Sequence, residues 1–238
     1  MRFKSSLVAL SLSLTCFIPR AALADSLTLT GVGGASTNGV YVYPYIFTVD
    51  VGSSSALGVD LSCLSYNREI QINEWWDVNT TPLGSLATGA SIDGTSDLQL
   101  REDAYLDALY DSGFDGATDS EIQFAIWDVL DPTDVNGNTG YDAEAQSLKA
   151  LAVAAASGES TAFLNQFTLY TPVVTSPAPG NWNGLGEPQE FLQYIPAGVP
   201  ADGPPPPAVP EPSSLILMGT GLFGAVFVMR RKLQTALA

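Results

Sequence analysis

The sequence contains no histidine among its 238 residues. Catalysis by a Ser–His or Cys–His pair, and zinc sites built on imidazole, are therefore excluded. Cationic side chains are also scarce, because the stretch from residue 25 to 202 holds only Arg68, Arg101 and Lys149 against 24 acidic residues, a formal charge near −21. Such a field repels phosphate backbones and favours cations or basic partners, so we expect no nucleic-acid binding.

Cysteine is nearly absent as well, with two in the whole chain. Cys16 lies in an apolar N-terminal segment that we expect to be removed, which leaves Cys63 alone. A single cysteine cannot form an internal disulfide, so it is free, paired between chains or committed to other chemistry. The simplest of these alternatives is a buried, inert thiol that packs as a small apolar side chain.

The N-terminus has the pattern of a secretory signal peptide. Arg2 and Lys4 precede an apolar run over residues 7–18, and small residues around 22–24 form a signal peptidase site with cleavage before Asp25. We therefore expect signal peptidase as a processing partner, a signal peptide at 1–24 and an exported domain at 25–195.

The C-terminus carries a second targeting signal. A Pro-rich linker at 196–209 leads to a short motif, an uncharged stretch at 213–229 that is just long enough to span a bilayer, and a basic cluster. The motif and the cluster consist of Pro210, Glu211 and Pro212, and of Arg230, Arg231 and Lys232. This order resembles the PEP-CTERM sorting signal of Gram-negative bacteria.

That resemblance implies export across the inner membrane and processing by exosortase near the motif. Before processing, the sorting segment at 210–232 would hold the protein in the membrane as a transmembrane helix, with residues 233–238 as a cytoplasmic tail. After sorting, the protein would reside at the cell surface or in the extracellular matrix.

Between these segments the sequence predicts an α+β domain. Alternating or β-branched patterns predict strands at 26–30, at 40–51 with an interruption at Pro44, at 59–64 and at 69–78. Helical patterns follow at 98–110, at 118–131 and at 142–156, and further strands at 163–174 and 190–195. We expect a sheet or partial barrel from the N- and C-terminal strands with a helical middle section.

The second predicted helix carries the main candidate site. Thr118 and Glu121 form a capping-box pattern at its start. An apolar stripe follows, made of Ile122, Ala125, Ile126, Val129 and Leu130. Gln123 lies beside this stripe, one turn before Trp127, so the two side chains are expected to meet at the edge of the buried face.

The segment from Gln123 to Trp127 reads Gln-Phe-Ala-Ile-Trp, and Cys63 precedes it on a predicted strand. In these features the domain resembles the thioester domains of Gram-positive surface adhesins, which pair a strand cysteine with a glutamine in a helical Gln-x-Ala-Ile-Trp motif. Leu64 after the cysteine also fits the family, whereas Ser62 and Ile122 differ from the residues that the family favours before the cysteine and the glutamine.

This second resemblance implies that the Cys63 sulfur attacks the Gln123 amide and forms an internal thioester, with Trp127 and Ile126 packed around it. An amine on a partner protein or polysaccharide would then become attached through Gln123. Such a protein performs one acyl transfer and is not an enzyme. The alternative is a structural protein of the extracellular matrix or envelope, with a free buried Cys63 and no covalent chemistry.

A calcium site is a weaker expectation, and we expect no other cofactor. Oxygen-bearing side chains crowd the loop before the third helix, at Asp131, Asp134, Asn136, Asn138 and Asp142. The loop is not an EF-hand, because Thr139 stands where glycine is needed and Ala145 where the closing glutamate is needed. A polar turn is the simpler interpretation, and a looser calcium site stays open.

Overall fold

The computed structural model describes residues 24–34, 36–37, 39–112, 114, 116–138, 141–173, 180–181 and 187–197. The predicted signal peptide, most of the Pro-rich linker and the whole PEP-CTERM segment, with its predicted membrane helix, lie outside these residues. Among the helices inside these ranges, none combines the length and the apolar character that a membrane span requires.

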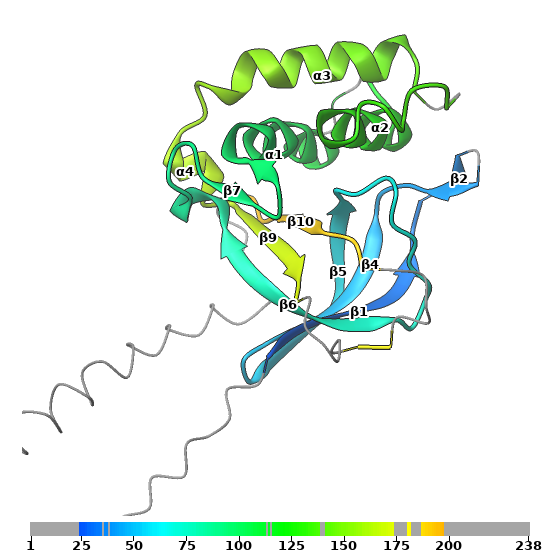
Figure 1. Cartoon of the computed structure of the whole chain (residues 1–238), viewed down its shortest axis with the longest axis vertical. Helices are drawn as coiled ribbons and strands as arrows, with labels where there is room; N and C mark the ends of the chain where they lie inside the picture. The colour runs from blue at the N-terminus through cyan, green and yellow to red at the C-terminus, as the bar shows by residue number, and fades with distance from the viewer. Residues whose placement is uncertain are drawn as a thin grey trace, which may run out of the picture.

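Strands from both ends of the exported domain close into an antiparallel barrel with the order β1-β4-β5-β10-β9-β6 (Figure 1). The strands are β1 (Asp25–Val32), β4 (Tyr45–Val51), β5 (Ser54–Cys63), β6 (Trp75–Pro82), β9 (Phe167–Pro172) and β10 (Phe191–Tyr194). Two small hairpins pair β2 (Ser36–Thr37) with β3 (Val40–Tyr41) and β7 (Ser91–Ile92) with β8 (Thr95–Ser96). The predicted α+β class and its barrel-like sheet are confirmed.

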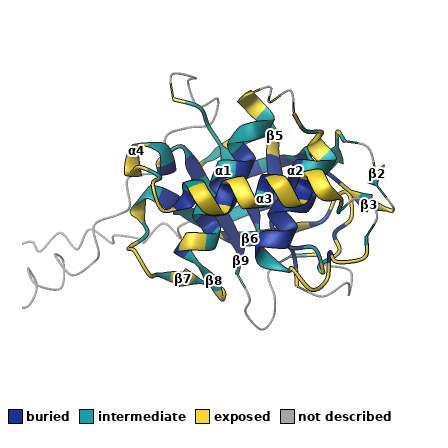
Figure 2. Ribbon diagram, turned by 90° about the horizontal axis from the view of Figure 1, so that it is seen from above, coloured by how far each residue is buried: buried dark blue, intermediate teal, exposed yellow. Residues whose placement is uncertain are grey.

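The middle of the chain forms a helical layer on one side of the barrel (Figure 1). Helix α1 (Asp97–Ser112) contacts β10, and α2 (Asp119–Leu130) contacts β5. Helix α3 (Ala143–Ala156) packs on α1 and α2 from outside, where Figure 2 shows its exposed face. The short helices η1 (Leu83–Ser85) and α4 (Thr161–Leu164) contact each other.

Alternation along β4 fills the barrel interior. Tyr45, Phe47 and Val49 are buried, while the residues between them are partly exposed, as a strand with one face inward requires. Phe47 packs edge-on against Phe191 and Trp76, with ring centroids 4.7 Å and 5.9 Å away. Each of these fully buried side chains stabilises the fold by about 2–3 kcal/mol of apolar burial.

Helix α2 lies beside α1, between β5 and α3, and is buried on nearly its whole surface. Its predicted capping box is present, with Thr118 Oγ1 accepting from Glu121 N at 3.2 Å and Glu121 Oε2 accepting from Thr118 N at 2.5 Å. Gln123 was expected at the edge of the buried face, and this is wrong, because the side chain is fully buried. Packing of α2 on α1, α3 and β5 leaves almost none of its surface open.

Two predicted strands begin later than their sequence patterns indicate. The strand predicted at 163–174 begins at Phe167, because Ser160 caps α4 by accepting from Phe163 N at 3.1 Å. In the stretch predicted at 69–78, β6 begins at Trp75. The residues before it turn, with Gln71 N donating to the Glu74 carboxylate at 2.8 Å. The three longer helices are confirmed to within a few residues.

Candidate functional site

Cys63 is the last residue of β5, and its side chain is fully buried. On one side β5 pairs with β4, and on the other it pairs with β10, where Cys63 lies opposite Phe191. The cysteine is free. Because α2 contacts β5, the thiol lies in the layer where the barrel meets the helices.

Gln123 on α2 reaches Cys63 directly. Its Nε2 donates a hydrogen bond of 2.7 Å to the Cys63 carbonyl oxygen, and both residues are 0% exposed. A buried amide without a partner would cost about 1–3 kcal/mol, so this bond fixes the carboxamide beside the strand. The structure thus places the Gln123 carboxamide against the backbone of Cys63, the residue with which the thioester-domain resemblance pairs it.

The other end of the same carboxamide faces a tyrosine on α1. The Tyr110 hydroxyl lies 3.5 Å from Gln123 Oε1 and also 3.5 Å from the Asp119 carbonyl oxygen. The Tyr110 ring stacks on the Tyr43 ring, with centroids 3.7 Å apart and planes inclined by 12°. This stack holds the hydroxyl over the glutamine.

The Cys63 sulfur has its own polar neighbours. It donates to Gln189 Oε1 at 3.1 Å, and the Ser65 carbonyl oxygen lies 3.4 Å away. Gln189 belongs to the segment that leads into β10 and is 6% exposed. The carboxamide that touches the thiol is therefore that of Gln189, whereas the Gln123 carboxamide contacts the backbone carbonyl of Cys63.

Burial raises the pKa of the Cys63 thiol to about 12, and the Glu190 carboxylate adds to this effect. The Trp127 indole, the Ser65 backbone and the Tyr45 hydroxyl lower the pKa, by less than burial raises it. The sulfur therefore carries its proton at neutral pH. A protonated thiol is a weak nucleophile, so any attack must be coupled to loss of that proton.

Trp127 and Ile126, the predicted packing residues, are both buried on α2. The Trp127 ring packs edge-on against Tyr66 and Phe124, with centroids 5.2 Å and 5.1 Å away. Its indole Nε1 makes no hydrogen bond of normal geometry within the described residues.

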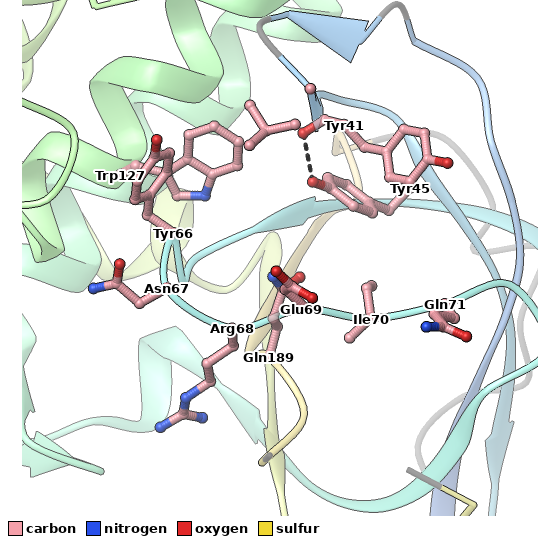
Figure 3. Close-up of a pocket in the computed structure, with 12 residues that line it drawn as sticks. Tyr41, Tyr45, Tyr66, Asn67, Arg68, Glu69, Ile70, Gln71, Trp127 and Gln189 are labelled. Carbon is pink, nitrogen blue, oxygen red and sulfur yellow. Dashed lines mark hydrogen bonds between the residues drawn. The ribbon is translucent and has the colours of Figure 1, made fainter. Parts of the chain in front are cut away.

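A cavity of about 470 Å³ opens beside the buried pair (Figure 3). Trp127 and Tyr66 lie on one side of it, and Tyr41 and Tyr45 lie on the other, where the Tyr45 hydroxyl donates to the Tyr41 carbonyl oxygen at 2.6 Å. The segment 66–71 completes the lining. The lining is therefore mixed, with four aromatic residues beside the charged Arg68 and Glu69.

This cavity and the thiol share a wall. Tyr45, Trp127 and Gln189 line the cavity and are also the side chains that act on the Cys63 sulfur. Neither Cys63 nor Gln123 lines it. A small molecule in the cavity would be separated from the sulfur by one layer of side chains, which must move to admit it.

Two of the calcium candidates, Asp142 and Asp134, accept hydrogen bonds within the fold. Asp142 Oδ1 accepts from Glu144 N at 3.0 Å and from Ala145 N at 3.1 Å, and so begins α3. The Asp134 carboxylate accepts from the Asn67 side chain. In the part of the chain that the structure describes, no group of three or more acidic or cysteine side chains is arranged to hold a metal ion.

Three residues around the pair were missed by sequence reasoning, namely Tyr45, Tyr110 and Gln189. Tyr110 stands at the end of a predicted helix and Tyr45 in a predicted strand, with no motif at either position. Gln189 lies between a Glu-Pro step and β10. The order of strands in the barrel brings Tyr45 and Gln189 to the cysteine, and the packing of α1 on α2 brings Tyr110 to Gln123. No local pattern in the sequence predicts either arrangement.

Comparison with known families identifies one region. Residues 208–232 match the PEP-CTERM protein-sorting motif. The predicted sorting signal is thereby confirmed, and Pro210, Glu211 and Pro212 lie within the matched region. The motif implies an exported protein that exosortase processes and that is sorted to the cell surface or extracellular space. Neither a comparison with curated proteins nor one with solved structures finds a match.

Proposed function

We propose that the exported domain forms an internal thioester between Cys63 and Gln123 and uses it to capture a partner covalently. The observation that carries this proposal is the 2.7 Å hydrogen bond from Gln123 Nε2 to the Cys63 carbonyl oxygen. It holds a carboxamide against a buried cysteine across two different layers of the fold. Proximity of this kind lowers the barrier of an intramolecular acyl transfer.

The reaction balances without an external reagent. The Cys63 sulfur attacks the side-chain carbonyl carbon of Gln123, the carbon–nitrogen bond breaks, and ammonia leaves with the thiol proton. A primary amine of the partner later attacks the same carbon, the carbon–sulfur bond breaks, and the sulfur regains a proton. The product is an amide between the Gln123 side chain and the partner.

Burial of the sulfur suits storage of such a bond. A basic thiolate is a slow leaving group, and burial raises the pKa of Cys63 to about 12. The side-chain wall formed by Tyr45, Trp127 and Gln189 also keeps bulk water from the acyl carbon. We therefore expect the thioester to resist hydrolysis and to react when an amine enters from the cavity.

The biological role would be that of an adhesin at the cell surface or in the extracellular matrix. The partner is an amine-bearing protein or polysaccharide. The acidic exported domain would attract such cationic groups before the covalent step. Because each molecule reacts once and does not regenerate, the protein is not an enzyme in the usual sense.

A structural matrix protein without covalent chemistry is the second candidate. The observation in its favour is that the Cys63 thiol already has a hydrogen-bond acceptor, Gln189 Oε1, at 3.1 Å. In that case Cys63 is a packed thiol, and the Gln123 carboxamide only satisfies a buried carbonyl group.

The intact mass of the mature protein separates the two candidates. The protein is purified after export from cells that express the full chain, and it is denatured in acid. The thioester predicts a mass lower by one ammonia than the sequence, and methylamine should erase this deficit by adding one methylamine. The structural alternative predicts the full sequence mass and a Cys63 thiol that is alkylated once the protein unfolds.

Variants assign the deficit to the two residues. Cys63→Ala and Gln123→Ala should each abolish the deficit and methylamine incorporation, while Gln146→Ala, on the exposed face of α3, should retain both. Incorporation that persists in either of the first two variants would sink the proposal.

A further inference from the structure

The Gln123 carboxamide is held at both ends, and the two bonds differ in length. The nitrogen end makes a 2.7 Å bond to the Cys63 carbonyl oxygen. At the oxygen end, the Tyr110 hydroxyl lies 3.5 Å away and is also 3.5 Å from the Asp119 carbonyl oxygen. Hydroxyl hydrogen bonds are normally about 2.5–3.0 Å long, so the Tyr110 hydroxyl is only loosely committed in the resting state.

Nucleophilic attack on this carboxamide increases the strength of hydrogen bonding that its oxygen requires. When a sulfur or an amine adds to the carbonyl carbon, Oε1 gains negative charge in the tetrahedral intermediate. A preorganised donor aimed at that oxygen stabilises the intermediate in a site from which water is excluded. A donor whose bond is long at rest and shortens as charge develops favours the transition state over the ground state.

We propose that Tyr110 is a catalytic residue of the acyl transfer, whose hydroxyl donates to Gln123 Oε1 in the tetrahedral intermediates of thioester formation and of aminolysis. The proposal rests on the proposed thioester function and adds the group that polarises the acyl carbon. Tyr110 keeps its proton throughout, and ammonia or the released thiol takes up the proton that is transferred.

The surroundings of Tyr110 suit a donor rather than a base. Burial, helped by the Asp107 and Asp119 carboxylates and the Tyr43 hydroxyl, raises the pKa of Tyr110 well above its usual range, so the phenol stays neutral. The stack on Tyr43, at 3.7 Å between centroids, fixes the ring. Within the described residues, Tyr110 is the donor that reaches Gln123 Oε1.

The test compares Tyr110→Phe with Tyr170→Phe in the full chain, purified after export. Tyr170 is a matched control because its hydroxyl also donates to a glutamine, Gln193 Oε1 at 2.7 Å, but in the β9–β10 ladder. The readouts are the fraction of molecules with the ammonia deficit and the rate of methylamine incorporation. Thermal unfolding, followed by near-ultraviolet circular dichroism, checks the fold.

We expect Tyr110→Phe to retain the fold, since it loses only a long hydrogen bond and keeps its ring stack. Its methylamine rate should fall by about 100- to 1,000-fold, the range seen when one oxyanion donor is removed, and Tyr170→Phe should react like the wild type. Tyr110→Leu, which loses both ring and hydroxyl, should be at least as slow.

The outcomes separate this inference from the function on which it rests. A wild-type protein without the ammonia deficit overturns both the thioester and the role of Tyr110. A wild type that shows the deficit, together with a Tyr110→Phe or Tyr110→Leu variant that reacts at the wild-type rate, overturns the role of Tyr110 alone. Equal slowing in Tyr170→Phe would assign the effect to lost stability and would also overturn it.

Discussion

The Cys63 thiol donates to Oε1 of Gln189 at 3.1 Å, although 126 positions separate the two residues in the sequence. Gln189 precedes β10, and Cys63 ends β5, so the contact exists because these two strands are neighbours in the barrel. Gln189 also lines the cavity. One side chain therefore both fixes the thiol and closes the wall between the thiol and the cavity.

Removing the Gln189 side chain should open that wall. The Gln123→Ala background keeps the Cys63 thiol free. In this background we expect Gln189→Ala to make native-state alkylation of Cys63 at pH 8 at least about tenfold faster. The reagent can then reach the sulfur from the cavity without a movement of side chains. Gln193→Ala in the same background is the control. Equal alkylation rates with and without Gln189 would show that the reagent reaches the sulfur by another route.

Asp107 on α1 gives the domain an unusual dependence on pH. It is 3% exposed, and its Oδ2 has no partner within the described residues. Burial raises the pKa of Asp107 to about 8; the Ser62 side chain opposes the shift and the Asp111 carboxylate adds to it. Around it, burial likewise raises the pKa values of the neighbouring Tyr43, Tyr110 and Tyr194, and of Asp103 on the same helix.

An unfolded aspartate has a pKa of about 3.9. Between about pH 4 and pH 8 the native state therefore keeps a proton that the unfolded state has lost, and the free energy of unfolding falls as the pH rises. Asp107→Asn should raise that free energy at pH 8, by on the order of 5 kcal/mol if the full shift is realised, and should reduce its slope with pH.

Urea unfolding at pH 5 and pH 8 measures this effect. The exposed Asp111→Asn variant, one turn along α1, is the control and should change stability far less. If Asp107→Asn loses as much stability as the wild type between these two pH values, Asp107 is ionised in the native state.

An ion pair between the partly exposed Lys149 and the buried Asp128 ties α3 to α2. Lys149 Nζ lies 2.8 Å from Asp128 Oδ2 and donates to the Asp128 carbonyl oxygen at 2.7 Å, while the Tyr141 hydroxyl donates to Oδ2 at 2.6 Å. Lys149→Met leaves the buried carboxylate with Tyr141 alone, so we expect a loss of about 3 kcal/mol in unfolding free energy. A further Asp128→Asn change should restore part of it.

A double-mutant cycle by urea unfolding at pH 7 tests that coupling. Solvent screens the pair if Lys149→Met lowers the free energy of unfolding by less than about 1 kcal/mol and the effects of the two single substitutions add up to that of the double variant. The result matters for the site, because Asp128 lies next to Trp127 on the helix that carries Gln123.

The sorting motif makes a prediction of its own. Replacing Pro210, Glu211 and Pro212 by alanine should prevent processing, because these residues lie within the matched region 208–232. The intact mass should then include every residue to 238, and the protein should remain in the membrane fraction. Gln234→Ala, beyond the matched region, is the control. Normal processing of the triple variant would place the recognition elsewhere.

Local signals in the sequence predicted much of this fold. The capping box at Thr118 and Glu121 correctly marks the start of α2, since both of its hydrogen bonds form within one turn. The pairing of Cys63 with Gln123 came from a motif, and the hydrogen bond between them is consistent with it. Helix boundaries were accurate because caps and periodicity act over short distances.

What the sequence did not predict depends on contacts between distant segments. Gln123 reads as a boundary residue from its own helix and is fully buried because α2 packs on β5 and α1, from which Cys63 and Tyr110 contact it. The contacts of Gln189 and Tyr110 need a closed barrel and a second helix in place. Helix α4 was missed because four residues are too few for a periodic pattern.

The pairing of Cys63 with Phe191 on β10 also determines the order in which the neighbours of the thiol form. Chains emerge from the N-terminus, so β5 has β4 beside it long before β10 exists. Gln189 arrives in that same final stretch of the domain. A chain halted before this point holds Cys63 and Gln123 but leaves the sulfur open to oxidants. The Cys63 thiol is therefore buried and protected only when β10 has paired with β5.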